Sequence, residues 1–294
     1  MIKGTLPETI YHYTSSDGLH GILSSGTLHF TDSLFLNDSR ERKEFYSLLE
    51  EEVRTWNSPF REFLMERYFN GRGFAAGDLE AEDPSQEETS RYFVLSCSLE
   101  KDSLPMWNYY TGKIHAGGYN IHFRTSELLE LLCRDPVVQK AAGGRRLLCG
   151  PVIYRDREKR KKIRELLDQI PVLLGAGKKG CVKTLDRALE KMSLFYKDGA
   201  FSHEREVRIV IPSANGTIYR LGAEAGEGIY RFRKVRAAQV PYLALDVLEK
   251  SRAISGVTAG PALDKELAVK GVEYMLCYYG FPQTCRVSAV PLRY

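Results

Sequence analysis

The sequence predicts one α+β domain, because strand patterns gather toward both ends of the chain and helical patterns fill the middle. Apolar residues recur at helical spacing around 126–134 and 155–195. Of the 294 residues, 43% are hydrophobic and 27% are charged, which is typical of a globular chain with a large core. We therefore expect a single domain over residues 1–294, with helical insertions near 39–70 and 125–195.

A strand, a short capped helix and a second strand are expected at the start of the chain. Residues 10–13 form the first strand, and a serine or aspartate at positions 15–17 caps the helix. Gly26 ends this helix, and "TLHFTD" resumes an extended segment. A long amphipathic helix then begins near Ser39, because apolar side chains recur there at helical spacing.

The rest of the chain alternates strands and helices. Residues 70–90 are rich in glycine and acids and predict a mobile loop. "RYFVLSCSL" predicts a strand, while "ALDVLEKSRA" and the segment after "AGPALD" predict helices. The other expected strands are 119–123, 205–212, 217–221, 238–244, "ISGVTA" and "TCRVSAVPLR".

Composition excludes several classes of protein. The net charge of +4 is too small to indicate nucleic-acid binding by itself. No apolar run approaches the roughly 18–20 residues that span a bilayer, and the N-terminal segment has no apolar signal core. We therefore expect a cytoplasmic protein with no membrane partner. The six cysteines are scattered and are expected to be free thiols, and the six histidines show no metal-ligand spacing, so no metal site is predicted.

Two basic segments have a structural interpretation beside a functional one. "YRDREKRKKIREL" at 154–166 suggests nucleic-acid binding, but its own acids favour a solvated helix face. "GAGKKG" at 175–180 resembles a phosphate-binding loop only faintly, because it lacks the ending Lys-Ser/Thr and a preceding apolar strand. A turn is the favoured interpretation of this second segment.

The segment "FSHEREVRIVI" places two carboxylates beside a guanidinium. Strand alternation predicts Glu204, Glu206 and Arg208 on one face and apolar side chains on the other. One interpretation is an edge strand with a surface salt-bridge ladder, worth about 0–1 kcal/mol. The other is a catalytic site in which Arg208 neutralises the two acids.

Three further groups of residues carry candidate chemistry. His12 lies in the first strand, where a lone histidine is more often structural. Ser96 and Ser98 share a strand face, which is a common pattern on its own. Trp107 and Tyr110 are three residues apart, so they either pack in the core or form an aromatic wall for a flat ring.

Taken together, these groups match what cleavage of a nicotinamide dinucleotide requires. Breaking the bond between nicotinamide and ribose creates an oxocarbenium-like transition state, which a carboxylate near the ribose stabilises. Hydroxyl groups orient that carboxylate, and aromatic rings sandwich the nicotinamide. A second carboxylate can take the proton of the incoming nucleophile.

The chain also resembles a family of largely uncharacterised bacterial proteins that is grouped with the ADP-ribosyltransferase clan. The resemblance runs nearly end to end and is most specific in "IYHYTSSDGLHGILSSGTLHFTD" and "FYKDGAFSHEREVRIV". Further similar segments are "FLNDSRE", "LSCSLEKDSLPMWNYYTG" and "SGVTAGPALDKE". The resemblance implies an ADP-ribosyltransferase-like fold: a split pair of packed β-sheets with flanking and inserted helices, and a cleft for NAD between the sheets.

The resemblance also implies roles for individual residues. Glu206 matches the catalytic glutamate, and Glu204 matches the residue that orients the acceptor in arginine-modifying members. His12 matches a first-strand position that binds a ribose hydroxyl or the dinucleotide backbone. Ser96 and Ser98 match a Ser-Thr-Ser strand in which Cys97 replaces the middle residue.

The remaining implied contacts to the dinucleotide come from Tyr13 and Thr14 of the "YHYT" segment, from the aromatic pair Trp107 and Tyr110, and from Arg208. Arginine-modifying enzymes usually carry Arg at the position of His12. The resemblance therefore does not identify arginine as the acceptor.

Three functions remain open at this point. The first is an ADP-ribosyltransferase that uses NAD as substrate, needs no metal and modifies a protein or nucleic acid, as a toxin or a phage-defence effector. The second is an NAD glycohydrolase with water as acceptor. The third is a non-catalytic nucleotide-binding or interaction module. For the first two we expect Gln in place of Glu204 or Glu206 to spare the fold, because a carboxylate on a strand face adds little to a core.

Overall fold

The computed structural model describes residues 6–36, 41–70, 91–111, 117–175, 180–213, 230–235, 237–248, 252–261, 264–282 and 284–291. The chain divides into two compact units. The sheet unit contains Met1–Phe35, Glu87–Pro151 and His203–Tyr294, and the helical unit contains Leu36–Gln86 and Val152–Ser202. The fold is mixed α+β. The expected organisation of the chain as one domain with two helical insertions remains a prediction.

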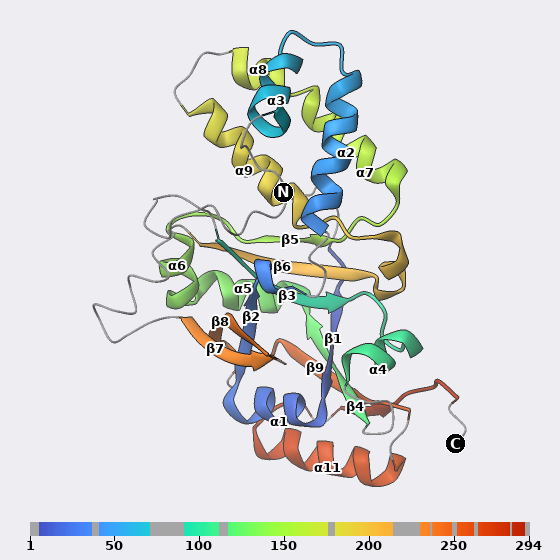
Figure 1. Ribbon diagram of the computed structural model, residues 1–294. Helices are drawn as coiled ribbons and strands as arrows, with labels where there is room; N and C mark the ends of the chain where they lie inside the picture. The colour runs from blue at the N-terminus through green and yellow to red at the C-terminus, as the bar shows by residue number, and fades with distance from the viewer. Residues whose placement is uncertain are drawn as a thin grey trace. The chain divides into compact units, whose positions relative to one another are not determined.

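Ten strands of the sheet unit form one hydrogen-bonded mixed sheet within the described residues (Figure 1). They are β1 (Thr9–Ser15), β2 (Thr27–Asp32), β3 (Arg91–Ser98), β4 (Gly118–Arg124), β5 (Leu148–Pro151), β6 (Glu206–Ser213), β7 (Tyr230–Val235), β8 (Ala238–Asp246), β9 (Ile254–Ala259) and β10 (Cys285–Val287). The strand order is β10-β9-β4-β1-β3-β2-β8-β7, with β6 paired to β3 and β5 paired to β6. Strands β9 and β10 are parallel, and the other pairs are antiparallel.

Strand β3 is the branch point of the sheet. Strand β6 pairs with it along its whole length, from Arg91↔Ser213 to Ser98↔Glu206. Because a strand has only two edges, β1 and β2 must share the other edge. Strand β1 pairs there at Ser98, and β2 pairs there at Phe93 and Val94. The sheet therefore splits between β1 and β2, at the level of Ser96.

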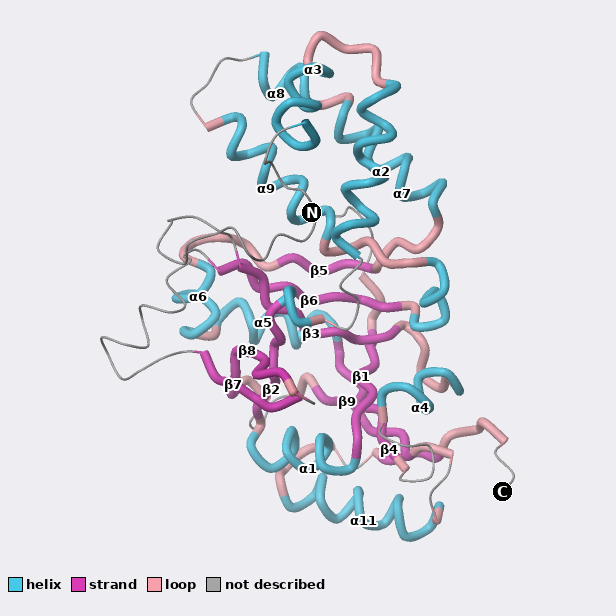
Figure 2. Tube along the Cα trace, viewed as in Figure 1, coloured by secondary structure: helices cyan, strands magenta, loops and turns pink. Residues whose placement is uncertain are grey.

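Helices that lie below the strands and at their left in Figure 2 pack against this sheet and contribute to the main core. The apolar side chains of "VRIVI" point into this core, as the alternation predicts, and they are Val207, Ile209 and Ile211. The core also takes side chains from α1 (Ser16–Ser25), α5 (Thr125–Arg134), α6 (Pro136–Ala142) and α11 (Lys265–Tyr278). The described residues of the unit also form two shorter elements, η1 (Ser33–Phe35) and α4 (Leu104–Tyr110).

The ends of α1 confirm the predicted capping. Ser15 is the N-cap, and its hydroxyl accepts a hydrogen bond from the Gly18 N–H at 3.1 Å. Gly26 takes a left-handed conformation with φ 67°, and its N–H bonds to the Ile22 carbonyl. The predicted order of strand, helix and strand is therefore confirmed over residues 9–32.

The helical unit packs around a separate apolar core. Its helices are α2 (Glu41–Thr55), α3 (Arg61–Met65), η2 (Glu66–Asn70), α7 (Asp156–Leu167), α8 (Ile170–Gly175) and α9 (Cys181–Ser193), while η4 (Gly199–Glu204) crosses into the sheet unit. The predicted helical spacing brings Phe45, Leu49 and Val53 of α2 into this core. Predicted residue Ser39 lies outside the described residues.

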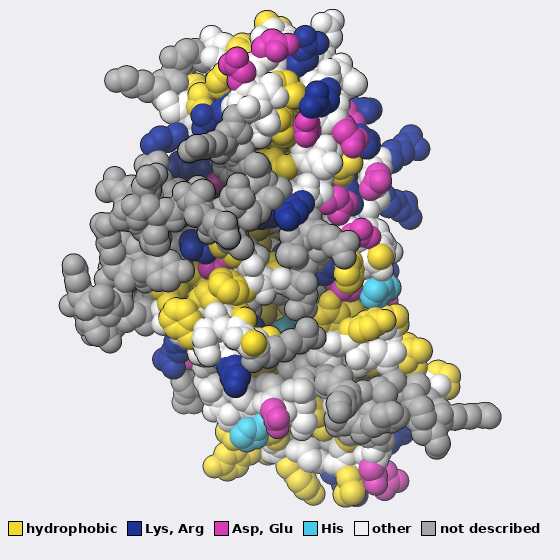
Figure 3. Space-filling view, in the orientation of Figure 1, with side chains coloured by type: hydrophobic (Ala, Val, Ile, Leu, Met, Phe, Trp, Pro, Cys, Tyr) yellow, Lys and Arg dark blue, Asp and Glu magenta, His cyan; other side chains and the backbone are white. Residues whose placement is uncertain are grey.

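The basic run 154–166 forms a helix that pairs with acids of its own unit. Arg160 and Arg164 both bond to the carboxylate of Glu52, and the fully buried Lys159 bonds to Glu44. Figure 3 shows Lys and Arg side chains interspersed with Asp and Glu over these helices. The solvated-helix interpretation is therefore favoured over a nucleic-acid surface.

Several expected elements differ from the structure. The start of "ALDVLEKSRA" extends β8 instead of a helix, because Leu243 and Leu245 alternate into the main core and pair with β2. "TCRVSAVPLR" forms a strand only at Cys285–Val287. Strands β5 and β7 are not predicted by the sequence patterns. The expected loop 70–90, the strand 217–221 and most of "GAGKKG" lie outside the described residues.

A buried histidine in β4 makes the stability of the sheet unit depend on pH. Burial, together with the charges of Lys101 and Arg286, lowers the pKa of His122 from 6.5 to about 4. The unfolded chain therefore takes up a proton as pH falls below 6.5, whereas the folded chain resists it. We expect this residue to remove about 3 kcal/mol from the free energy of unfolding between pH 6.5 and pH 4.

Chemical denaturation at several pH values measures this effect. His122→Gln should flatten that part of the pH profile, while His20→Gln, on the exposed side of α1, should leave it unchanged. A profile that stays equally steep in His122→Gln would contradict the assignment.

Candidate functional site

His12 lies where the sheet splits. It follows Tyr11, which is the β1 residue paired with Ser98 of β3. Its Nδ1 lies 3.1 Å from the Ser96 carbonyl oxygen, and because a carbonyl only accepts, Nδ1–H must donate. Neutral His12 therefore keeps a lone pair on Nε2. Burial lowers the pKa of His12, the bond to Ser96 opposes this, and the charge of Arg233 lowers it further.

Glu206 and Arg208 form a buried ion pair on β6. Arg208 Nε lies 2.9 Å from Glu206 Oε1, and Arg208 Nη2 lies 3.0 Å from Oε2, which is a two-point fork. The side chains are 5% and 1% exposed respectively. The surface-ladder interpretation is wrong, because β6 is paired on both edges and this pair is desolvated.

Glu204 does not share the strand with Glu206. It ends the 3₁₀ helix η4, and β6 begins only at Glu206. Arg205 between them has a left-handed backbone with φ 41°, so the alternation that predicts one face for both acids fails here. Glu204 is buried and accepts a hydrogen bond from the Tyr110 hydroxyl at 2.5 Å. Tyr110 therefore lies beside Glu204.

The two serines of β3 have different surroundings. Ser96 is exposed and pairs with Arg208 across β3 and β6. Ser98 is fully buried, donates to the Glu204 carbonyl at 2.6 Å and accepts from the Glu100 N–H at 2.9 Å. Ser98 thus fixes the backbone that carries Glu204, while Ser96 offers its side chain to solvent.

This contrast gives a test within one strand. Ser98→Ala should lower the free energy of unfolding by about 1–3 kcal/mol, because it removes the hydrogen bonds that the buried Ser98 hydroxyl makes to the backbone of Glu204 and Glu100. Ser96→Ala should change it by no more than about 0.5 kcal/mol. Equal losses in denaturant unfolding of the two variants would contradict the assignment of Ser98.

The aromatic pair does not form an open wall. Trp107 is 1% exposed, and its ring packs edge-on against Tyr13 with centroids 4.7 Å apart. Its indole N–H donates to Asp102 at 2.7 Å, and the Tyr13 hydroxyl donates to the Glu100 carbonyl at 2.8 Å. The core-packing interpretation of Trp107 is therefore favoured, and its ring does not face a ligand in this conformation.

Two other residues bear on access to the site. Thr14 is buried and lies against the start of α1, where a side chain at Gly18 would meet its hydroxyl. Tyr109 is 72% exposed, with its ring centroid 5.9 Å from that of His203. Tyr109 therefore lies on the surface. The side chain that bonds to the Glu206 carboxylate is Arg208.

Sequence reasoning misses two residues here. Asp102 accepts the Trp107 indole, the Ser288 hydroxyl and the Ala289 N–H, so it ties α4 to the C-terminal segment. Arg233 of β7 acts electrostatically on His12. No local pattern identifies either residue, because the groups on which they act are distant in sequence.

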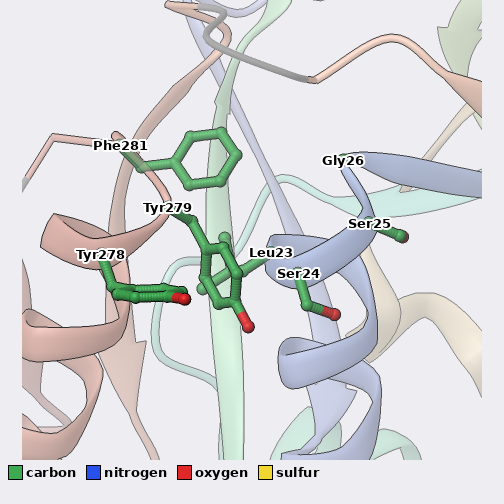
Figure 4. A pocket seen from close by; sticks show the side chains of 7 residues that line it. All are labelled: Leu23, Ser24, Ser25, Gly26, Tyr278, Tyr279 and Phe281. Carbon is green, nitrogen blue, oxygen red and sulfur yellow. The ribbon is translucent and has the colours of Figure 1, made fainter.

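A cavity of about 340 Å³ lies elsewhere in the sheet unit, between the C-terminal ends of α1 and α11. Leu23, Ser24, Ser25 and Gly26 line one side, and Tyr278, Tyr279 and Phe281 line the other (Figure 4). None of the predicted site residues lines it. This cavity offers hydroxyl groups and aromatic rings but no charged side chain.

Comparison with known proteins gives one match. The model of a family described as "Protein of unknown function (DUF2971)" matches residues 106–209, roughly a third of the chain. This segment contains Trp107, Tyr110 and residues 204–208, whereas His12 and Ser96 precede it. Comparisons with curated proteins and with solved structures find no match. Within the described residues, no helix has the length and apolar character needed to cross a membrane.

Proposed function

We propose that the chain binds NAD at the split in the sheet and transfers its ADP-ribose to a macromolecule. One observation carries this proposal: β1, β3 and β6 lie side by side, and His12 bonds to Ser96, whose partner on β6 is Arg208, bonded to Glu206. Residues from three distant parts of the sequence thus meet through direct contacts. The proposal includes an ADP-ribosyltransferase-like arrangement of the strands as a split pair of sheets.

Glu206 would stabilise the positive charge that develops on the ribose as the bond to nicotinamide breaks. This task needs a carboxylate that stays ionised and fixed, and the fork from Arg208 supplies both conditions. The same guanidinium weakens the field that reaches the substrate.

His12 would act as a hydrogen-bond acceptor toward the substrate. Its Nδ1–H is held by the Ser96 carbonyl, so Nε2 is left to accept from a ribose hydroxyl. Burial and the charge of Arg233 favour the neutral form that this role requires. The exposed Ser96 hydroxyl lies on the adjacent strand and can donate to the same ligand.

Glu204 would hold the acceptor and take its proton. Its carboxylate already accepts from the Tyr110 hydroxyl, which orients it without adding charge. A macromolecular acceptor would then approach from the side of Tyr109, whose ring is on the surface. If water takes this place, the same site is an NAD glycohydrolase.

The fork between Arg208 and Glu206 favours a second candidate, a non-catalytic nucleotide-binding module. A buried carboxylate that is already held in a fork by Arg208 has less capacity to act on a ligand. In that case His12 and Ser96 would bind a nucleotide, and Glu206 would serve only the fold.

Tracing of the label from NAD separates the candidates. The purified full chain is incubated with a bacterial lysate and NAD labelled in its adenylate phosphate. Transfer predicts label in protein or nucleic acid, with Glu204→Gln reducing that label but sparing slow release of free ADP-ribose. Hydrolysis predicts free ADP-ribose only. Intact NAD after long incubation, under conditions where NAD binds, would overturn both catalytic proposals.

A further inference from the structure

A cluster of cationic and aromatic side chains lies on the face of the sheet opposite the main core. Leu28 and Phe30 of β2 and Leu243 of β8 point into the core, so the residues between them point the other way. This outer face carries His29 and Thr31 of β2, Tyr242 of β8, and Arg231 and Arg233 of β7. These strands are neighbours, with Tyr242 paired to both Thr31 and Arg231.

Contacts within the cluster hold Arg233 in place. Its Nη2 donates to the Thr31 hydroxyl at 2.7 Å, and its guanidinium carbon lies 5.4 Å from the centroid of the Tyr242 ring. The His29 ring lies 4.3 Å from the same tyrosine ring. Both partners of Arg233 are neutral, so they position the guanidinium without compensating its charge.

The charge of this cluster is unbalanced. Among the described residues no carboxylate pairs with Arg233, whereas the half-buried Arg91 pairs with Asp32 and the buried Arg208 pairs with Glu206. Asp246 shares the face at its far end, where the Thr27 hydroxyl donates to it. Desolvation lowers the pKa of Arg233. Desolvation also lowers the pKa of His29, and the charges of Arg233 and Arg231 lower it further. Arg231 and Arg233 therefore place two positive charges on the same face of β7.

We propose that Arg233, Arg231, His29 and Thr31 form a binding site for the phosphate groups of a nucleotide. A guanidinium fork that is fixed in position and lacks a carboxylate matches a phosphate in geometry and charge. Thr31 pairs with Val94 of β3, two residues from Ser96, which places the cluster beside the split in the sheet. A nucleotide diphosphate with its ribose at His12 brings its phosphates toward this cluster. The site rests on the nucleotide binding at His12 that the proposed function includes, but it does not require that NAD is cleaved.

Calorimetric titration of the full chain with ADP, ADP-ribose, inorganic diphosphate and adenosine tests this site. The wild type should bind ADP and ADP-ribose, bind inorganic diphosphate more weakly and leave adenosine unbound. Arg233→Gln should weaken the binding of ADP by about ten- to a hundredfold, since it removes charge-assisted hydrogen bonds. Arg233→Lys should recover only part of the loss, because a lysine keeps the charge but not the fork.

Arg286→Gln is the matched control, because Arg286 is an exposed strand arginine of the same sheet, in β10. It should bind ADP as the wild type does. Equal losses in Arg233→Gln and Arg286→Gln would reduce the site to general attraction by positive charge and overturn the proposal. An Arg233→Gln variant that melts at the wild-type temperature and binds ADP unchanged would also overturn it.

The two proposals can fail separately. Binding of ADP-ribose through Arg233 without any release of nicotinamide would leave the phosphate site standing and reject NAD cleavage. Cleavage of NAD with an unchanged KM in Arg233→Gln would support NAD cleavage and reject the phosphate site.

Discussion

Replacing Arg208 with Met is expected to lower the free energy of unfolding by about 3–5 kcal/mol, because it leaves the buried carboxylate of Glu206 without its cation. The double variant Arg208→Met with Glu206→Leu should lose much less than the sum of the two single changes, since it removes both charges together. Urea or guanidinium unfolding measures all three free energies.

An exposed ion pair provides the control for this prediction. Arg134 pairs with Glu130 one helical turn away on α5, and both side chains are more than half exposed. Arg134→Met should cost no more than about 0.5 kcal/mol. A loss of that small size in Arg208→Met would mean that the Glu206 pair is solvated and contributes little to the fold.

Glu206→Gln is expected to slow the release of nicotinamide by about a hundred- to a thousandfold, if the site is catalytic. The change removes the charge that stabilises the developing cation and keeps the shape of the side chain. Glu204→Gln should retain slow cleavage and lose transfer to the acceptor. Similar, modest losses of both activities in the two variants would contradict the separate roles of these acids.

The structure corrects one expectation about these variants. Neither acid lies on an open strand face, because Glu206 is 5% exposed and Glu204 is 4% exposed. Gln at position 206 leaves the guanidinium of Arg208 buried without its counter-charge, so this variant should also be less stable. Rates must therefore be compared well below the melting temperature, with binding of NAD measured on the same sample.

Local patterns in the sequence predict much of the sheet unit. Ser15 and Gly26 mark the ends of α1, and alternation identifies β3, β4 and β6. They succeed because capping and burial on one face depend on residues close in sequence. The pairing of Arg208 with an acid of its own strand is predicted for the same reason.

Contacts between segments that are distant in sequence could not be predicted from local patterns. The left-handed backbone of Arg205 separates Glu204 from the strand, and nothing in the residue type signals it. The burial of Trp107 depends on Tyr13 and Asp102, and the cluster around Arg233 depends on the order β2-β8-β7. The branching of the sheet at β3 likewise follows from the pairing of strands, which sequence periodicity does not encode.

The direct measurement of the central claim is the release of nicotinamide by the wild-type chain. Purified protein is mixed with NAD, with and without a bacterial lysate, and free nicotinamide is separated from NAD and quantified over time. The proposed function predicts release that saturates with NAD and falls to background in Glu206→Gln. No release from wild-type protein that binds NAD would contradict catalysis and identify the site as a nucleotide-binding module.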